Sequence, residues 1–254
     1  MRHICISKLP NIFLIGAFVG TLAAFTVEAE EIRTGEALIQ AMHDRYRNNW
    51  YETVTFTQKS TAHKPDGTNS SEIWHEAAML PGKLRIDIGA PSEGTGTLIA
   101  DGMLTSFKDG QVTRSLAFVH ELLVLGFDVY RQDPQITIDQ LKEQGFDLAR
   151  VHEDTWEGHA VYVVGATAKQ FWVEKERLLF VRLMEPDRRD KAKRGETRFT
   201  DYRQLRVGWI AARVEFYSDG KNVFTEKYSE IEANPKLDPA IFDAKQFGSR
   251  HWEK

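Results

Sequence analysis

The sequence predicts an α+β fold, with an antiparallel sheet of about a dozen short strands and two helical segments that cover one face. Short β-patterned segments separated by tight-turn signals recur through most of the chain. One segment near the N-terminus and one in the middle have helical periodicity instead. A sheet with this many strands must curve to protect its edges and to cover its apolar face.

The first 29 residues have the composition of a signal peptide. Arg2 and Lys8 supply positive charge, Ile12 to Phe25 is an uncharged and mostly apolar run, and Val27-Glu28-Ala29 is a small-x-small cleavage pattern. The run is shorter than the roughly 20 apolar residues that span a bilayer as a helix. We therefore expect a signal peptide over residues 1–29 and a single domain over residues 30–254. The alternative is an uncleaved N-terminal anchor.

The cysteine content and the net charge exclude several classes of protein. The only cysteine, Cys5, precedes the apolar run, whereas a bacterial lipoprotein needs its cysteine directly after that run. We therefore expect an unlipidated protein in the periplasm, without a disulfide framework or a thiolate zinc site. The chain has 33 Lys and Arg against 37 Asp and Glu, for a formal net charge of −4. Nucleic acid is an unsuitable partner, because neutralising phosphates requires a basic excess.

The first elements of the mature chain are a helix and a hairpin. A helix is predicted at Gly35 to Tyr46, where apolar residues recur every four positions. Tyr51 to Ser60 then alternates apolar residues with threonines, which predicts a strand. Lys64-Pro65-Asp66-Gly67 is a turn signal, and Ser71 to Met79 is the returning strand.

Further strands follow at short intervals. Residues 84–88 alternate strictly between apolar and charged side chains, which predicts a strand. Two short strands come next, Thr97 to Ala100 and Met103 to Phe107, joined at Asp101-Gly102. An Asp-Gly pair is a strong hairpin signal because a type I′ turn needs positive φ at both central residues. Asp109-Gly110 repeats the signal.

The β pattern breaks between residues 116 and 145. Phe118 to Gly126 is apolar nearly all round, and Asp133-Pro134 is an N-cap followed by proline at the first helical position. A second helical pattern continues to Gly145. We expect two short helices here, as an insert across the sheet.

The rest of the chain returns to β patterning, with turns at Trp156-Glu157-Gly158, Lys175-Glu176-Arg177 and Ser218-Asp219-Gly220. The segment Leu178 to Met184 is apolar on both faces, so we expect it to lie between two apolar layers. In Ile210 to Tyr217, apolar residues face one way and charged residues the other.

Several short motifs occur in a characteristic order along the mature chain. They are Phe56-Thr57-Gln58-Lys59, Leu80-Pro81, Leu98-Ile99-Ala100-Asp101-Gly102 with Phe107 after it, Phe171-Trp172-Val173-Glu174, and Leu237-Asp238-Pro239-Ala240-Ile241-Phe242-Asp243. In order and spacing they resemble the LolA/LolB-like superfamily of periplasmic lipoprotein carriers, the outer-membrane lipoprotein-sorting proteins. The resemblance implies an incomplete β-barrel, closed by helices around a cavity for acyl chains. It also implies no metal, no cofactor and no catalytic residue.

One position departs from the family pattern. The carriers have an arginine directly before the proline of the second hairpin, where it helps to hold the lid. Leu80 stands at that position here, and Arg85 lies five residues later, where a substitute role stays open. The missing arginine weakens the case for lipoprotein delivery and leaves a general lipid-binding role open.

The candidate ligand-binding residues are thirteen apolar side chains on the predicted strands and the insert. They could line an apolar cavity, or they could fill a dry core, which is the usual place of such side chains. They are Phe56, Trp74, Leu84, Ile86, Phe107, Phe118, Leu122, Leu123, Leu125, Phe127, Phe180, Val214 and Phe216.

Other chemistry-bearing patterns are weaker. His152 and His159 flank a turn and could face each other across a hairpin, but no third metal ligand is evident. The sequence has no HExxH or G-x-S-x-G motif, and Gly94-Thr95-Gly96 lacks the lysine and helix of a phosphate loop. Pro186 to Arg194 holds five basic residues against two acidic ones. This segment could touch anionic headgroups at a membrane surface, or it could be a solvated hairpin loop.

Two functions of different classes fit these observations. The first is a non-catalytic, monomeric carrier that binds the acyl chain of a lipid or lipoprotein for transfer to or within the outer membrane, with only peripheral membrane contact. The second is an envelope scaffold or sensor that docks a protein partner through its apolar face. A hydrolase is disfavoured, because no nucleophile–base pair is evident.

In the carrier hypothesis, Phe118 to Phe127 is a mobile cover whose side chains fill the empty cavity. Leu122→Asp or Leu123→Asp would then weaken lipid binding by more than about tenfold while the sheet still folds. If these leucines belong to a permanent core instead, the same changes bury a charge and unfold the protein.

Overall fold

The computed structural model describes residue 1 and residues 31–252. The expected signal peptide, with Cys5, lies outside the described residues apart from Met1, and its cleavage stays a prediction. From Ile32 onward the chain forms one compact unit, to which the following description applies.

Within residues 31–252, thirteen strands form one antiparallel sheet. The strands are β1 (Thr53–His63), β2 (Asn69–Met79), β3 (Lys83–Ile88), β4 (Gly96–Ala100), β5 (Met103–Lys108), β6 (Gln111–Ala117), β7 (Val151–Trp156), β8 (His159–Ala166), β9 (Lys169–Glu174), β10 (Leu179–Pro186), β11 (Arg194–Gln204), β12 (Trp209–Ser218) and β13 (Lys221–Ala233). Their order in the sheet is β6-β5-β4-β3-β2-β1-β13-β12-β11-β10-β9-β8-β7. The sheet is not closed, since β6 and β7 are edge strands. The predicted fold class, an incomplete antiparallel barrel with helical cover, is confirmed.

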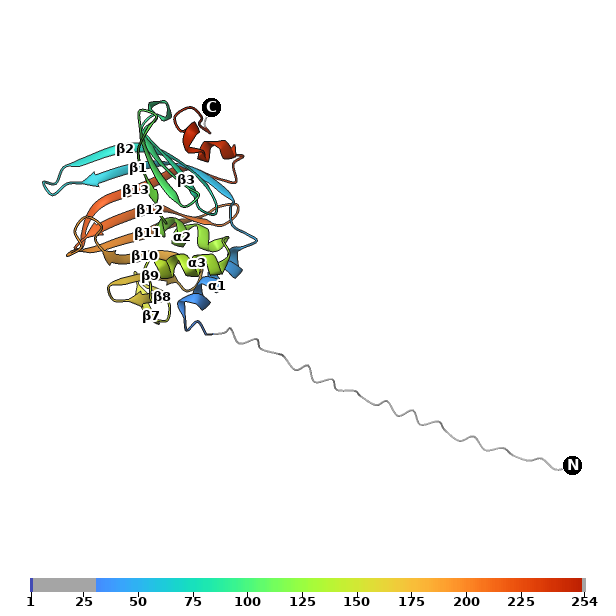
Figure 1. The fold of residues 1–254 in the computed structure, drawn as a ribbon. Helices are drawn as coiled ribbons and strands as arrows, with labels where there is room; N and C mark the ends of the chain where they lie inside the picture. Colours follow the sequence, from blue (N-terminus) through green and yellow to red (C-terminus); the bar gives the residue numbers. More distant parts are fainter. Residues whose placement is uncertain (2–30, 253–254) are drawn as a thin grey trace. The chain divides into compact units, whose positions relative to one another are not determined.

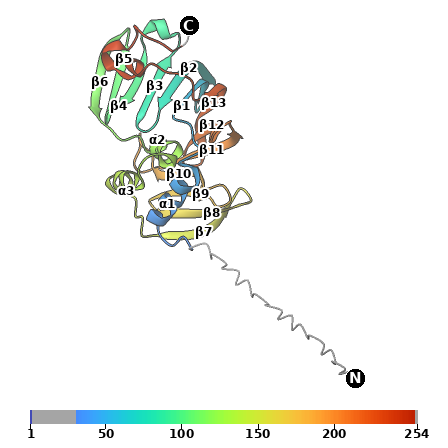
Figure 2. The same cartoon turned by 90° about the vertical axis from the view of Figure 1, so that its right-hand side faces the viewer.

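The topology explains why the helical insert covers the sheet. Two meanders, β1–β6 and β7–β13, are joined by the pairing of β1 with β13. The connection from β6 to β7 therefore runs from one edge of the sheet to the other. This connection contains α2 (Glu121–Gly126), the 3-10 helix η2 (Asp128–Tyr130) and α3 (Pro134–Glu143). Figures 1 and 2 show α2 and α3 beside the N-terminal helix α1 (Gly35–Tyr46), next to the β9–β11 part of the sheet.

Local sequence signals set the ends of the helices. The Thr34 hydroxyl accepts a hydrogen bond from the backbone N–H of Ala37 at 3.1 Å, and this cap starts α1 at the predicted residue. Asp133 caps α3 by accepting from the N–H of Gln135 at 2.8 Å, with Pro134 in the first turn as predicted. Among the described residues, no helix combines the length and apolarity needed to cross a membrane.

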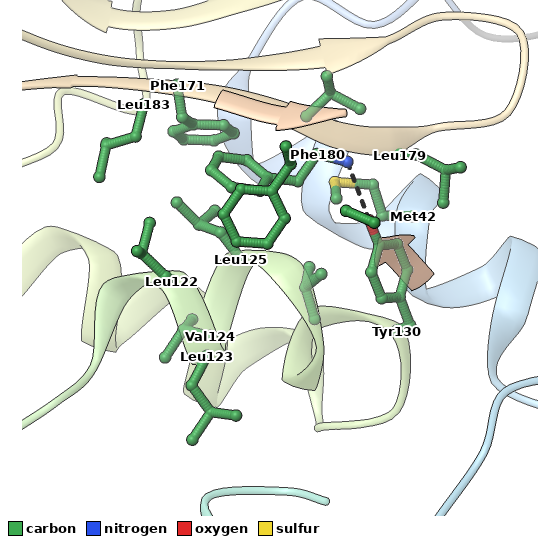
Figure 3. Close-up of a cluster of buried hydrophobic side chains, with 14 of the residues drawn as sticks. Met42, Leu122, Leu123, Val124, Leu125, Tyr130, Phe171, Leu179, Phe180 and Leu183 are labelled. Atoms are coloured by element: carbon green, nitrogen blue, oxygen red, sulfur yellow. Dashed lines mark hydrogen bonds between the residues drawn. The ribbon is translucent and has the colours of Figure 1, made fainter. Parts of the chain in front are cut away.

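The main core lies between the helices and one face of the sheet. It includes Leu38 and Met42 of α1, Leu125 of α2, and Phe171 and Phe180 of the sheet. The insert is anchored there by Tyr130. Its ring stacks on Trp50 with 3.9 Å between the ring centroids, and its hydroxyl accepts from the N–H of Phe180 at 2.9 Å (Figure 3).

The opposite face of β9 and β10 carries a second apolar cluster that includes Trp172, Val181 and Met184. The prediction that this segment lies between two apolar layers is confirmed. A register shift between Phe180 and Arg182 changes the strict alternation, so that Phe180 and Leu183 both face the helices.

The C-terminal segment, residues 237–252, covers the face of β3–β5 that points away from the helices. This cover explains why two charged side chains of β3 are buried. Arg85 and Asp87 on β3 both have fully buried side chains, although strict alternation with apolar residues is typical of a strand with one solvated face. The Arg85 guanidinium donates to both carboxylate oxygens of Asp87, at 2.9 and 3.0 Å, and to the carbonyl of Ile241 at 3.1 Å. It also lies 4.5 Å from the centre of the Phe247 ring. Arg85 therefore fixes the C-terminal segment and does not contact the insert.

Gly126 at the end of α2 permits a close approach to the sheet. A Cβ at this position would lie 2.9 Å from Cε1 of Phe199. We expect Gly126→Ala to lower the free energy of unfolding by about 1–3 kcal/mol, because the buried ring must move. Urea denaturation measures this. Phe199→Leu in the Gly126→Ala background should recover part of the loss. Equal stability of Gly126→Ala and the unmodified protein would contradict the close packing of α2.

Candidate functional site

A cavity of about 710 Å³ opens on the helix-bearing face of the sheet. Its floor is formed by three aromatic side chains: Trp74 on β2, Phe216 on β12 and Phe224 on β13. Phe224 lies between the other two, with ring centroids 5.9 Å from Trp74 and 5.9 Å from Phe216. Leu122 at the start of α2 contributes to the wall, and residues of the turn between β10 and β11 also line the cavity.

Strand register places these aromatic side chains on one face. Gln58 of β1 pairs with Trp74 of β2 and with Tyr228 of β13. Phe224 is four residues before Tyr228 and so points to the same side. Phe216 is opposite Phe224 across the β12–β13 hairpin.

Ion pairs connect the start of α2 to the strands and to the β10–β11 turn. Glu121 is buried, and its carboxylate accepts from Lys169 on β9 and from Arg188 in the turn, the latter at 2.7 Å. Arg188 also donates to Glu185 on β10 at 3.1 Å. The segment Pro186 to Arg194 thus forms part of the cavity, and Arg188 is engaged in intramolecular ion pairs.

His120 caps α2 as a neutral ring. Its Nδ1 accepts from the backbone N–H of Leu123 at 3.3 Å. Burial, with a further contribution from the positive charge of Arg188, lowers the pKa of His120 to about 4. An uncharged imidazole can accept this hydrogen bond, whereas an imidazolium cannot.

The thirteen predicted residues occupy different places. Trp74, Leu122 and Phe216 line the cavity. Ile86 lies half-buried on the same face, on β3. The remaining residues on this face belong to the main core or pack against it: Phe56, Leu84, Phe118, Leu123, Leu125, Phe127, Phe180 and Val214.

The structure corrects the prediction that Phe107 lines the cavity. It pairs with Gly96 and points to the face of the sheet that carries Leu98. There it stacks on Phe247 of the C-terminal segment, with 4.0 Å between ring centroids. The structure therefore separates Phe107 from the other candidates.

The leucines of α2 also differ from one another. Figure 3 shows Leu125 pointing toward the phenylalanine rings of the sheet, whereas Leu123 points to another side of the helix. Leu122, Leu123 and Leu125 are all buried in the main core, and Leu122 also reaches the cavity. The insert is thus part core and part cavity wall.

Two carboxyl groups, the half-buried Glu226 and the buried Glu76, lie on the same face of the sheet as the aromatic floor. Glu226 on β13 lines the cavity, and Tyr228 donates its hydroxyl to Glu226 Oε2 at 2.9 Å. Burial raises the pKa of Glu226 to about 7. Glu76 on β2 faces the same side, and burial together with the charge of Glu226 raises its pKa well above the ordinary value.

A third buried carboxyl group, Asp128 of η2, holds the insert to the β2–β3 turn. It accepts from the backbone N–H of Gly82 at 3.1 Å. Burial raises the pKa of Asp128 to about 7. Leu80, two residues before Gly82, is buried in the main core. At this turn, a carboxyl–backbone contact therefore joins the insert to the sheet.

These shifts predict the pH dependence of stability. In the unfolded chain Asp128 and Glu226 titrate near 3.8 and 4.5, and in the folded chain both titrate near 7. Between these values the folded state holds more protons. The free energy of unfolding therefore falls as pH rises toward 7, and the loss is complete above that pH.

We expect Glu226→Gln to remove this loss at one of the two sites. The variant should match the unmodified protein near pH 5 and should be more stable by about 1–3 kcal/mol at pH 8. Thermal melts at the two pH values measure this, with Glu232→Gln on the exposed side of the same strand as the control. If the variant is no more stable at pH 8, the Glu226 carboxylate does not carry a poorly solvated charge without a cation in the folded protein.

The residues that sequence reasoning missed are on β13. A regular hairpin around Ser218-Asp219-Gly220 would place Val223 opposite Phe216. A register shift between Phe216 and Tyr217 brings Phe224 there instead. Glu226 has no sequence signal, because a glutamate in a strand is usually solvated.

The histidine hypothesis is also corrected. His159 pairs with Trp156, whereas His152 pairs with Val163, so the two rings do not face each other across the hairpin. No group of three metal-ligating side chains occurs within the described part of the chain.

Comparisons with known proteins give structural matches alone. No family model and no curated protein matches the sequence. A DUF1329 family protein from Desulfovibrio piger is similar with a TM-score of 0.57 and 14% identity, over 84% of this chain and 97% of that protein. A putative outer membrane lipoprotein-sorting protein domain from Vibrio parahaemolyticus has a TM-score of 0.54 and 12% identity, over 84% and 98%.

A LolA superfamily protein from Nitrosomonas europaea is similar with a TM-score of 0.50 and 13% identity, over 82% of this chain and 97% of that protein. At these identities the matches establish the fold and no more.

Proposed function

We propose that this chain, which has a LolA-like fold, is a non-catalytic carrier that holds the acyl chain of a lipid-like ligand. The observation that carries the proposal is the cavity over Trp74, Phe216 and Phe224. Its volume of about 710 Å³ is within the range of roughly 300–1,000 Å³ that small-molecule sites occupy. Its floor is aromatic, and one wall is Leu122 of the insert.

The energetics suit a carrier. Each methylene that leaves water gains roughly 0.8 kcal/mol, so a chain of about 15 methylenes gains about 12 kcal/mol. A carrier must retain most of this and still release its ligand. The β10–β11 turn, which lines the cavity, is held by the ion pairs of Arg188 with Glu121 and Glu185. Such polar contacts can exchange with water more easily than a packed core.

The proposal includes location and chemistry. Residues 1–29 act as a signal peptide for export to the periplasm. One structurally similar protein is described as a putative outer membrane lipoprotein-sorting protein domain, and this supports a role in transfer to or within the outer membrane. A carrier of this kind needs no catalytic residue. Because Arg85 fixes the C-terminal segment, a lipid ligand is favoured over a lipoprotein.

Native mass spectrometry of the protein purified with mild detergent tests the proposal. We expect a fraction that carries an adduct of lipid mass. Organic extraction should remove this adduct, and added decan-1-ol should then bind in its place and give an adduct of its own mass. Replacement of Phe216 by Asp should remove the adduct, and Ile136→Asp on the exposed side of α3 should keep it. A protein that neither retains nor takes up any alkyl compound would contradict the carrier and favour the scaffold.

A further inference from the structure

The buried polar groups beside the cavity have more hydrogen-bond acceptors than donors. Gln58 on β1 is 1% exposed, and its Nε2 donates to Ser60 Oγ at 2.7 Å. Its Oε1 is buried and accepts no hydrogen bond. The Gln58 side chain lies beside Glu226, close enough to influence its pKa. Buried polar atoms without a partner are rare in folded proteins and call for an explanation.

The carboxyl groups on the two neighbouring strands have few partners, although none of their oxygens is a fully buried atom without a partner. Tyr228 donates to Glu226 Oε2 at 2.9 Å, and the Gln58 side chain is a second hydrogen-bonding group, which offsets part of the rise that burial causes in the pKa of Glu226. Glu76 has no hydrogen bond to any residue of 31–252 and is 5% exposed. Gln58 Oε1, Glu76 and Glu226 are therefore three acceptors on one face of three neighbouring strands.

The carboxyl groups also differ from the other buried acids in their lack of a counter-charge. Glu121 pairs with Lys169 and Arg188, and Glu196 pairs with Arg182 and Arg198. Within the described chain, neither Glu76 nor Glu226 forms an ion pair. An ionised acid without a cation is costly in such a place, and this cost raises the pKa of both groups.

The aromatic floor supplies a second feature that suits a cation. Trp74, Phe216 and Phe224 line the same cavity as Glu226. The faces of aromatic rings attract ammonium groups, and aromatic cages beside carboxylates recognise them. The cavity lining as a whole contains five acidic residues and three basic ones. Two of the basic ones, Arg188 and Lys193, are paired with acidic neighbours.

We propose that this floor is a subsite for the primary ammonium head group of a long-chain amphiphile. Glu226 lines the cavity and can accept an N–H of the ammonium group, and the unpartnered Gln58 Oε1 lies on the same face of the sheet. The Glu226 carboxylate supplies the counter-charge, and the rings of Trp74 and Phe224 line the same cavity. The alkyl chain extends toward Leu122 and the β10–β11 turn. An anionic head group would meet the like charge of Glu226 at this floor.

This inference rests on the proposed carrier function and adds the chemical class of its ligand. Isothermal titration calorimetry at pH 7.5 tests it with three probes of equal chain length: decylamine, decan-1-ol and decanoate. The unmodified protein should bind decylamine at least about tenfold more tightly than decanoate, with decan-1-ol between them.

Glu226→Gln provides the decisive comparison. This variant should lose about tenfold in affinity for decylamine and keep its affinity for decan-1-ol within about twofold. Glu232→Gln, on the exposed side of the same strand, should change neither. A melting temperature of Glu226→Gln at or above that of the unmodified protein shows that the loss is not unfolding.

The outcomes separate the two proposals. If decan-1-ol binds but decylamine and decanoate bind equally, or if Glu226→Gln leaves decylamine binding unchanged, the ammonium subsite is wrong and the carrier remains. If none of the three compounds binds, both proposals are wrong.

Discussion

Replacing Arg85 by Leu is expected to lower the free energy of unfolding by about 3–5 kcal/mol, because the change leaves the Asp87 carboxylate buried without its partner. Both side chains are fully buried, and the guanidinium also holds Ile241 and lies over Phe247. The change therefore destabilises β3 and releases the C-terminal segment. Chemical denaturation measures the loss, and protease cleavage after residue 236 should accelerate.

The double variant Arg85→Leu/Asp87→Leu is the control. Apolar residues of similar volume often replace a buried ion pair at little cost, so the double variant should recover most of the lost stability. Equal losses in the single and double variants would show that the shape of the arginine side chain, rather than its charge, stabilises this face.

Leu122→Asp and Leu123→Asp are expected to have different effects, although the residues are adjacent. Both leucines belong to the main core, but Leu122, which is 9% exposed, also lines the cavity, whereas Leu123 is 4% exposed and does not. A charge at residue 123 should cost several kcal/mol and unfold the domain near room temperature. A charge at residue 122 can reach the cavity, so this variant should fold and bind a fluorescent fatty-acid probe about tenfold more weakly.

Thermal melts and probe titrations on the same samples separate these outcomes. Ile136→Asp, at an exposed position of α3, is the control for adding a charge to the insert. If Leu122→Asp folds and binds the probe as well as the control does, Leu122 is not part of the ligand site. If Leu123→Asp folds normally, the insert is not part of a permanent core.

The elements that local chemistry determines could be predicted from the sequence. The bounds of α1 follow from the Thr34 cap and the four-residue period, and the Asp-Gly pair at Asp101-Gly102 produced the expected hairpin. The meandering order follows from such turns. What the sequence does not contain is the pairing of β1 with β13, which depends on residues far apart in the chain.

The site was harder to predict, for two physical reasons. The sheet has apolar clusters on both faces, and alternation within one strand does not show which cluster a residue joins, so Phe107 was assigned to the wrong face. Second, register shifts at the β12–β13 hairpin and in β10 moved residues relative to their expected partners. The positions of Phe224 and Glu226 on the cavity face depend on the register shift at the β12–β13 hairpin. The composition of the segment does not indicate that these side chains are shielded from water.

The most direct test of the carrier proposal is a crystal structure grown with 12-bromododecan-1-ol, because the anomalous signal of bromine locates the alkyl chain. The neutral head group keeps this test independent of the ammonium subsite. We expect the bromine and its chain in the cavity bounded by Trp74, Leu122 and Phe216. Bromine confined to another place, such as the smaller pocket of about 370 Å³ beside Leu98 and Phe242, or an alkyl chain bound nowhere, would contradict the account.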